Sequence, residues 1–156
     1  MPLDEQDPRE WDAALIAEGE AWLRRATGRG HPGRFQLEAA IQAVHCARAR
    51  TGRTDWPALL MLYRALVLVA PSLGAHVALA GVVGRVEGPG AGLAALEPLA
   101  GRPAVGTFQP YWATRAHLLA QAGRVDDALA AYEAADALTD DEAVRGYLRE
   151  RVARLG

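Results

Sequence analysis

The stretch QPYWATRAHLLAQAGRVDDALAAYEAADALTDDE, residues 109–142, decides the fold. Its first half carries Trp112 near the start of a helical segment, and the pair Gly123-Arg124 marks a turn. The second half places small and aromatic side chains on one helix face, at Ala128, Tyr132 and Ala135. Such side chains let two antiparallel helices approach closely. The stretch therefore predicts a helix, a tight turn and a second helix that packs back on the first.

The same pattern recurs upstream at a regular spacing. Tyr63 precedes Tyr132 by 69 residues, and the turn glycines Gly88 and Gly123 are 35 residues apart. These spacings resemble the 34-residue tetratricopeptide repeat, in which each unit is one helix pair. They predict three repeats: Ala40–Leu73, Gly74–Phe108 and Gln109–Glu142.

The predicted fold class is all-α, with antiparallel helix pairs stacked as a short right-handed solenoid of about eight helices. We expect one domain, 1–156, in which 1–33 form an N-terminal capping helix and loop, 34–142 the helix pairs and 143–156 a C-terminal capping helix. Stacked pairs bury a continuous core and leave a concave face lined by the first helix of each pair. A helical bundle without repeats is the alternative.

Caps and prolines delimit the expected helices. Asp7 with Pro8, and Asp55 with Pro57, are typical helix starts, and Ser72 is a third. The carboxylates of Asp126-Asp127 and Asp140-Asp141-Glu142 also stand where helices begin, so capping accounts for them without catalysis. After the first helix, which starts at Asp7, the expected helices span about 34–50, 56–70, 72–86, 93–99, 108–122, 126–138 and 142–155, with 101–106 as a loop.

The composition and charge of the chain limit the classes of function that we expect. The chain has 156 residues, 51% of them hydrophobic and 23% charged, which is typical of a folded domain. The net charge is −2 and the 17 basic residues, all arginine, are scattered, so direct nucleic-acid binding is not expected. The most apolar segment, Leu59–Leu73, contains Arg64 and is shorter than the roughly 20 residues of a membrane span.

The sequence contains no strong candidate for a catalytic, metal-binding or phosphate-binding site. Adjacent helix positions do not face each other, so His45-Cys46 is not read as a nucleophile with its base, and we expect Cys46 to be a buried thiol. The four histidines lack metal-pair spacing, and the glycine-rich segment 88–92 lacks the lysine of a phosphate loop. One cysteine and the absence of a secretory pattern favour a reducing cytoplasm. We therefore expect no enzyme, no metal and no cofactor.

Several segments together resemble one bacterial family. They are Gln6-Asp7, Trp11-Asp12, Leu15–Gly19, Gln36–Ile41, Val44-His45, Thr54-Asp55-Trp56, Leu62-Tyr63, Ala70-Pro71-Ser72, Val86–Pro89, Gly92-Leu93, Arg115-Ala116, Leu118-Leu119 and Gly123-Arg124. The chain is similar, over nearly its whole length, to the C-terminal tetratricopeptide-repeat-like extension of extracytoplasmic-function (ECF) RNA polymerase sigma factors. One departure is Ala78-Leu79, where that family usually carries an asparagine–arginine pair.

The resemblance implies a regulatory role in transcription initiation. The implied partners are the sigma core domains, RNA polymerase or both, and promoter recognition is not carried over because no helix-turn-helix is matched. A stand-alone tetratricopeptide-like adaptor that binds another partner is the second hypothesis. A helical domain that senses a small molecule is the third.

Two sets of side chains are candidates for binding. If the solenoid forms, its concave face would carry four polar side chains: Arg48, Arg85, His117 and Gln121. Basic groups there favour an acidic segment or a C-terminal carboxylate. For the sensor hypothesis, the candidate groove residues are Trp56, Tyr63, Tyr111 and Trp112, although aromatic residues at such spacings are more often core.

Overall fold

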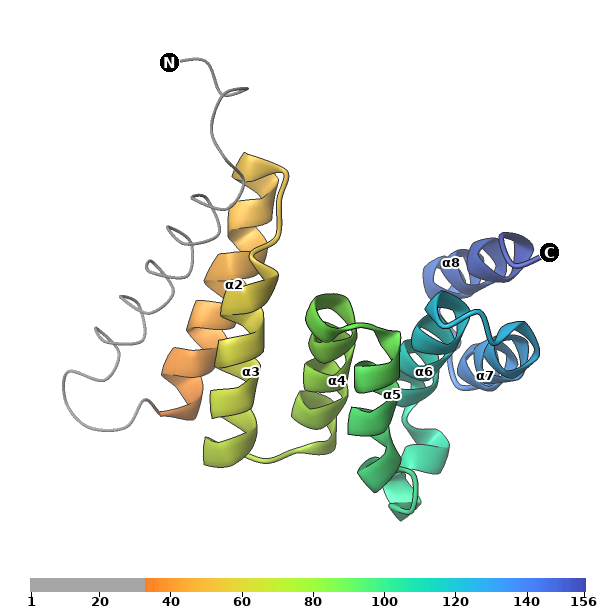
Figure 1. Cartoon of the computed structure of the whole chain (residues 1–156), viewed down its shortest axis with the longest axis horizontal. Helices are drawn as coiled ribbons and strands as arrows, with labels where there is room; N and C mark the ends of the chain where they lie inside the picture. Colours follow the sequence, from red (N-terminus) through yellow and green to blue (C-terminus); the bar gives the residue numbers. More distant parts are fainter. Residues whose placement is uncertain (1–32) are drawn as a thin grey trace. The chain divides into compact units, whose positions relative to one another are not determined.

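The computed structural model describes residues 33–156 (Figure 1). These residues form seven α-helices and two short 3-10 helices, with no strand among them, so the predicted all-α class is confirmed. The helix expected to start at Asp7 and the loop that follows it lie outside the described residues. The chain divides into two compact units, Met1–Ala70 and Pro71–Gly156. The expectation of a single domain stays a prediction.

The described part of the first unit is one helix pair. Helices α2 (Arg34–Thr51) and α3 (Trp56–Val69) run antiparallel and pack side by side (Figure 1). Gly52, with φ of 68°, ends α2 in the left-handed conformation that glycine adopts without strain. Asp55 starts α3 as predicted, because its carboxylate accepts a hydrogen bond of 3.0 Å from the backbone amide of Ala58.

The buried face of α2 is shorter than the sequence predicts. Leu37 and Ile41 are buried, but the buried positions of α2 end there. His45, which was considered for the inward face, is exposed, and the prediction that Cys46 is a buried thiol is wrong. Cys46 follows Ile41 by five positions, which at about 100° per residue turns it roughly 140° away from the buried stripe.

The second unit contains five α-helices in sequence. They are α4 (Leu73–Glu87), α5 (Pro89–Leu96), α6 (Gln109–Gln121), α7 (Val125–Ala137) and α8 (Glu142–Ala153). The 3-10 helices η2 (Glu97–Leu99) and η3 (Pro103–Thr107) connect α5 to α6. Helix α4 packs on α5, α6 packs on both of them and on α7, and α7 packs on α8 (Figure 1). Helix α6 therefore packs on the preceding pair, α4 and α5, and α8 packs on the preceding helix, α7.

Two hydrophobic clusters hold the second unit together. One is formed by α4, α5, the two 3-10 helices and α6, and includes Leu96, Leu99 and Leu118. The other is formed by α6, α7 and α8, and includes Tyr132 and Leu148. Partly buried Leu93 and Trp112 pack against both clusters, so the two cores are continuous.

Helices α4 and α5 approach each other at glycines. Gly84 and Gly92 face each other so closely that a Cβ built on Gly92 would lie 2.8 Å from the Cα of Gly84 and 2.9 Å from the carbonyl oxygen of Ala80. Leu118 of α6 fills the space beside them, where its Cδ2 would clash with a Cβ built on Gly84. Gly84 therefore lowers the helix propensity of α4, but its lack of a side chain permits α4 and α5 to cross closely.

One helix start differs from the expectation. The helix predicted at 93–99 instead begins at Pro89, because Gly88 takes a φ of 102° and Pro89 then occupies the first turn, where its missing amide is not needed. Its last residues form η2 rather than α-helix. Within the predicted loop at 101–106, η3 begins at Pro103 and Val105 is buried.

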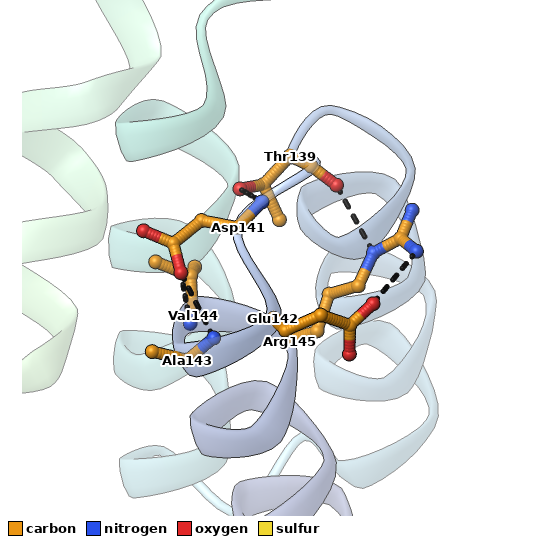
Figure 2. Close-up of polar contacts among 6 residues, drawn as sticks. All are labelled: Thr139, Asp141, Glu142, Ala143, Val144 and Arg145. Carbon is orange, nitrogen blue, oxygen red and sulfur yellow. Dashed lines mark hydrogen bonds and ion pairs between the residues drawn. The ribbon is translucent and has the colours of Figure 1, made fainter.

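The start of α8 confirms the predicted cap (Figure 2). The Asp141 carboxylate accepts hydrogen bonds from the backbone amides of Ala143, at 2.8 Å, and Val144, at 3.4 Å. Arg145 donates from Nε to the carbonyl oxygen of Thr139 at 3.0 Å and pairs with Glu142 at 3.6 Å. The acidic run therefore anchors the turn between α7 and α8. Asp126 and Asp127 lie in the first turn of α7, but no side chain caps that helix.

Candidate functional site

Three basic side chains of the second unit, here called the basic cluster, come from three different helices. They are Arg85 of α4, His117 of α6 and Arg151 of α8. Arg85 directly follows Gly84 and His117 directly precedes Leu118, and Gly84 and Leu118 are in contact.

Residues adjacent in the chain to His117 and to Arg151 belong to one hydrophobic cluster. Ala116, the residue before His117, shares a core cluster with Leu148, and Val152, the residue after Arg151, packs against that cluster. The three basic side chains therefore lie next in the chain to residues through which α4 packs on α6 and α6 shares a core cluster with α8.

The electrostatics of His117 reflect this arrangement. Its pKa is lowered from the ordinary value of 6.5, first by partial burial and then by the positive charges of Arg151 and Arg85. Both effects disfavour the imidazolium form. At neutral pH the ring is accordingly neutral, and it can donate one hydrogen bond and accept another.

Tyr147 positions Arg151 within the cluster. The Arg151 Nε donates a hydrogen bond of 3.0 Å to the Tyr147 hydroxyl, and the guanidinium lies 5.3 Å from the centre of the Tyr147 ring. The hydrogen bond that Arg151 donates to the Tyr147 hydroxyl is the main reason that the pKa of Arg151 is raised. Tyr147 is 53% exposed although it is large and aromatic, so this pair is accessible to a partner.

Tyr132 of α7 and Glu150 of α8 complete the surroundings. Burial raises the pKa of Tyr132, while Arg151 opposes that rise. Glu150 forms an ion pair with Arg154 and also raises the pKa of Arg151. Glu150 therefore interacts with both Arg151 and Arg154.

The other predicted polar residues are placed as follows. Gln121 is exposed one turn after His117 on α6. Arg48 is exposed on α2 in the first unit, and its carbonyl oxygen accepts the amide of Gly52. Among the predicted side chains, the charge of Arg85 contributes to the lowered pKa of His117.

Core packing accounts for the two aromatic candidates of the second unit. Tyr111 is buried in the cluster with Leu96 and Leu118. Trp112 meets it edge-on at 5.3 Å between ring centres and donates from Nε1 to the carbonyl oxygen of Val105 at 3.0 Å. Trp56 and Tyr63 are half-buried on α3, and burial raises the pKa of Tyr63.

Within 33–156, no three or more His, Cys, Asp or Glu side chains gather as they would to hold a metal ion. In the same part of the chain, no helix has the length and apolar character needed to cross a bilayer.

Sequence reasoning missed Arg151 and Tyr147. It assigned the last helix only a capping role, yet Arg151 follows His117 by 34 residues and His117 follows Arg85 by 32. The repeat spacing was therefore a signal that could have located Arg151. Tyr147 lies one turn before Arg151 on the same helix face, where an i, i+4 pair is expected to interact.

The second unit is thus an all-helical body of packed successive helices with a basic cluster on α4, α6 and α8. An uncharacterized protein of Rhizobium meliloti (strain 1021) is 37% identical over 153 residues, which covers 98% of this chain and 36% of the relative. The chain therefore spans about a third of the length of this curated relative. No family model and no solved structure matches the chain.

Proposed function

We propose that this chain is a regulatory, protein-binding module of an ECF-type RNA polymerase sigma factor. The observation that carries the proposal is the resemblance of its segments, from Gln6-Asp7 to Gly123-Arg124, to the C-terminal extension of that family. The module would act in the cytoplasm during transcription initiation, without catalysis and without touching nucleic acid itself. Its partners would be the sigma core domains, the polymerase or both.

The helix packing supports the tetratricopeptide-like part of this proposal. In a stack of helix pairs, the first helix of each pair packs against both helices of the pair before it. Helix α6 has this relation to α4 and α5, and α8 packs on α7 after the pair α6 and α7. The connection between α6 and α7 is short and turns at Gly123, with φ of 75°.

The charge distribution supports a protein partner over nucleic acid. The second unit carries eight arginines against ten carboxylates, so it has no general attraction for a phosphate backbone. The match to part of a longer relative also agrees with a module carried within a larger protein.

Co-purification tests the proposal. The full chain, the separately expressed sigma core domains of the same organism and its RNA polymerase are mixed at moderate salt, which suppresses pairing between distant exposed charges. We expect stable capture of the sigma domains or the polymerase. If neither is retained at protein concentrations that saturate a micromolar complex, the sigma-factor assignment is wrong and the stand-alone adaptor hypothesis takes its place.

A further inference from the structure

We propose that residues 8–27 of this chain dock as a helix along the exposed side of α2, with Phe35 as the anchor of the interface. The docked segment would run antiparallel to α2 and would place Trp22 against Ala39. The proposal concerns the first unit and does not depend on the proposed function. It assigns an interaction surface to the side of α2 that is exposed in the described structure.

Helix α2 carries a second stripe of residues besides its buried one. Leu37 and Ile41 are buried, and α2 packs on α3. Another set of positions recurs at alternating steps of four and three residues, and its members are all exposed: Phe35, Ala39, Gln42, Cys46 and Ala49. Steps of four and three return to one side of a helix, and this is the spacing by which two helices pack along their length. The exposed side of α2 therefore has the pattern of a helix-packing face.

Phe35 is the largest side chain on this face. It is 79% exposed, and the Arg34 guanidinium lies 5.9 Å from the centre of its ring without covering it. Apart from Gln42, the other positions of the face carry small side chains, so a second helix can approach closely. Facing helices pack well where large side chains meet small ones. A suitable occupant therefore has large side chains opposite Ala39 and Cys46, and a small one opposite Phe35.

The segment before α2 has the length and the position of such an occupant. It lies outside the described residues, but its sequence predicts a helix from Pro8 to about residue 27, followed by the loop 28–33. The predicted helix has 20 residues and α2 has 18, and six residues are an ordinary connection between antiparallel helices. Because the loop ends where α2 begins, the predicted helix is tethered beside the exposed face.

The large and small side chains of the two helices are complementary in one register. The register places residues at equal distances from the loop opposite each other, beginning with residues 27 and 34. Ala26 then meets Phe35, and Trp22 meets Ala39, so a small side chain faces a large one in both pairs. The simplest antiparallel hairpin therefore brings the stripe of the segment onto the exposed face of α2.

The polar residues fit the same register. Glu18 and Gln42 are the polar members of the two stripes, and they fall within one position of being opposite each other. Asp12 falls within one position of Arg50, which flanks the exposed stripe near the end of α2. Polar residues in a helix seam fix the register, and opposite charges beside the seam favour the same pairing. Charge and polarity therefore agree with the match in side-chain size.

A second copy of the chain is the competing occupant. Two α2 helices could also pair antiparallel, with Phe35 of each copy opposite Ala49 of the other. Such an interface has one large side chain from each copy, whereas stable complexes bury roughly 800 Å² on each partner. The tethered segment needs no such area, because a short connection gives it an effective concentration in about the millimolar range. The segment of the same chain is therefore the occupant that the sequence and structure favour.

Cross-linking to Cys46 tests the proposal in the full chain. Cys46 is the single cysteine and lies opposite Leu15 in the proposed register, so Leu15→Cys should form an intramolecular disulfide with it during oxidation with copper phenanthroline. Ala17→Cys is the matched control, because a side chain two residues further along a helix points roughly 160° away. We expect the disulfide to form at least about tenfold faster in Leu15→Cys, as measured by non-reducing electrophoresis and mass spectrometry.

Further substitutions show whether side-chain packing holds the segment in place. Adding Trp22→Ala to Leu15→Cys removes the largest proposed contact and should slow the cross-link by about tenfold. Adding Glu20→Ala, on the opposite side of the predicted helix, should leave the rate unchanged. Adding Ala39→Glu places a charge under Trp22 and should also slow the cross-link by about tenfold. Circular dichroism and thermal melts establish that each variant is folded.

Two results in these variants would overturn the proposal. One is an equal rate in Leu15→Cys and Ala17→Cys, and the other is a disulfide that joins two chains instead of closing within one. Ala39→Cys tests the second copy directly, because residues 39 and 46 of one helix are about 10 Å apart and cannot bond to each other. Disulfide-linked dimers of this variant at micromolar protein concentration would show that two α2 faces meet, and we expect the variant to stay monomeric.

Discussion

The Cβ position of Gly92 is closed by backbone atoms of Gly84 and Ala80 as well as by the Leu118 side chain. A methyl group there would meet Gly84 and the carbonyl oxygen of Ala80, so α4 and α5 would have to separate. Overpacking of this kind costs about 1–3 kcal/mol, and the better helix propensity of alanine returns up to about 1 kcal/mol. We expect Gly92→Ala to lower the free energy of unfolding by about 1–2 kcal/mol, measured by urea denaturation.

Gly81 is the matched control on the same pair of helices. A Cβ on Gly81 would lie 3.6 Å from Thr114 Cγ2, which is ordinary van der Waals contact. Gly81→Ala should therefore be neutral or stabilise the protein by up to about 1 kcal/mol. If both alanines behaved alike, the close crossing at Gly84 and Gly92 would not be the reason for these glycines.

His117 makes stability depend on pH in a defined direction. Its pKa in the folded chain is lowered below 6.5 by burial and by Arg151 and Arg85. Between the folded pKa and 6.5 the unfolded chain binds more protons, so stability falls as the pH drops through this window and is retained above it. Urea midpoints measured from pH 7.5 to 5 should fall less steeply for His117→Gln than for the wild type.

A substitution of Arg151 tests directly why the pKa of His117 is lowered. If its charge helps to disfavour the imidazolium, Arg151→Gln should raise the pKa of His117 toward 6.5, as measured by NMR titration of the ring. Burial remains in the variant, so the return should be partial. An unchanged pKa would mean that the two side chains do not interact in solution.

At the scale of helices, the hydrogen bonds of Asp141 hold the start of α8. Asp141→Ala removes the acceptor for the amides of Ala143 and Val144, and a lost cap of this type costs about 0.5–2 kcal/mol. We expect a lower urea midpoint with an unchanged slope. Asp140→Ala is the control, because it removes the same charge from the residue before the cap. Equal losses would indicate that the helix dipole, and not the cap bonds, explains the effect.

Helix starts could be predicted from the sequence because they depend on neighbours in the chain. Asp55 with Pro57, Ser72 and Asp141 each contact residues within the next turn, and all three begin helices as expected. The start of α5 was misplaced because Gly88 adopts a positive φ that allows Pro89 to open the helix.

The candidate site could be predicted only in part, for a physical reason. Arg85 and His117 were proposed from their helix positions, and the charge of Arg85 contributes to the lowered pKa of His117. Arg151 also lowers this pKa, and it lies on α8, whose shared hydrophobic cluster with α6 and α7 is not specified by the sequence of α8 alone. Exposed Cys46 has a different explanation, because its position five residues after Ile41 turns it roughly 140° away from the buried stripe of α2.

For the whole molecule, the division at Ala70 predicts how the chain unfolds. Both described clusters of the second unit are built entirely from residues after Pro71, including the side chains that pack against them. A unit that supplies its own core should fold alone. We expect the fragment 71–156 to show helical circular dichroism and a cooperative melt. A fragment that melts without cooperativity would mean that residues before Pro71 stabilise these cores, and the two units would then have to be treated as one.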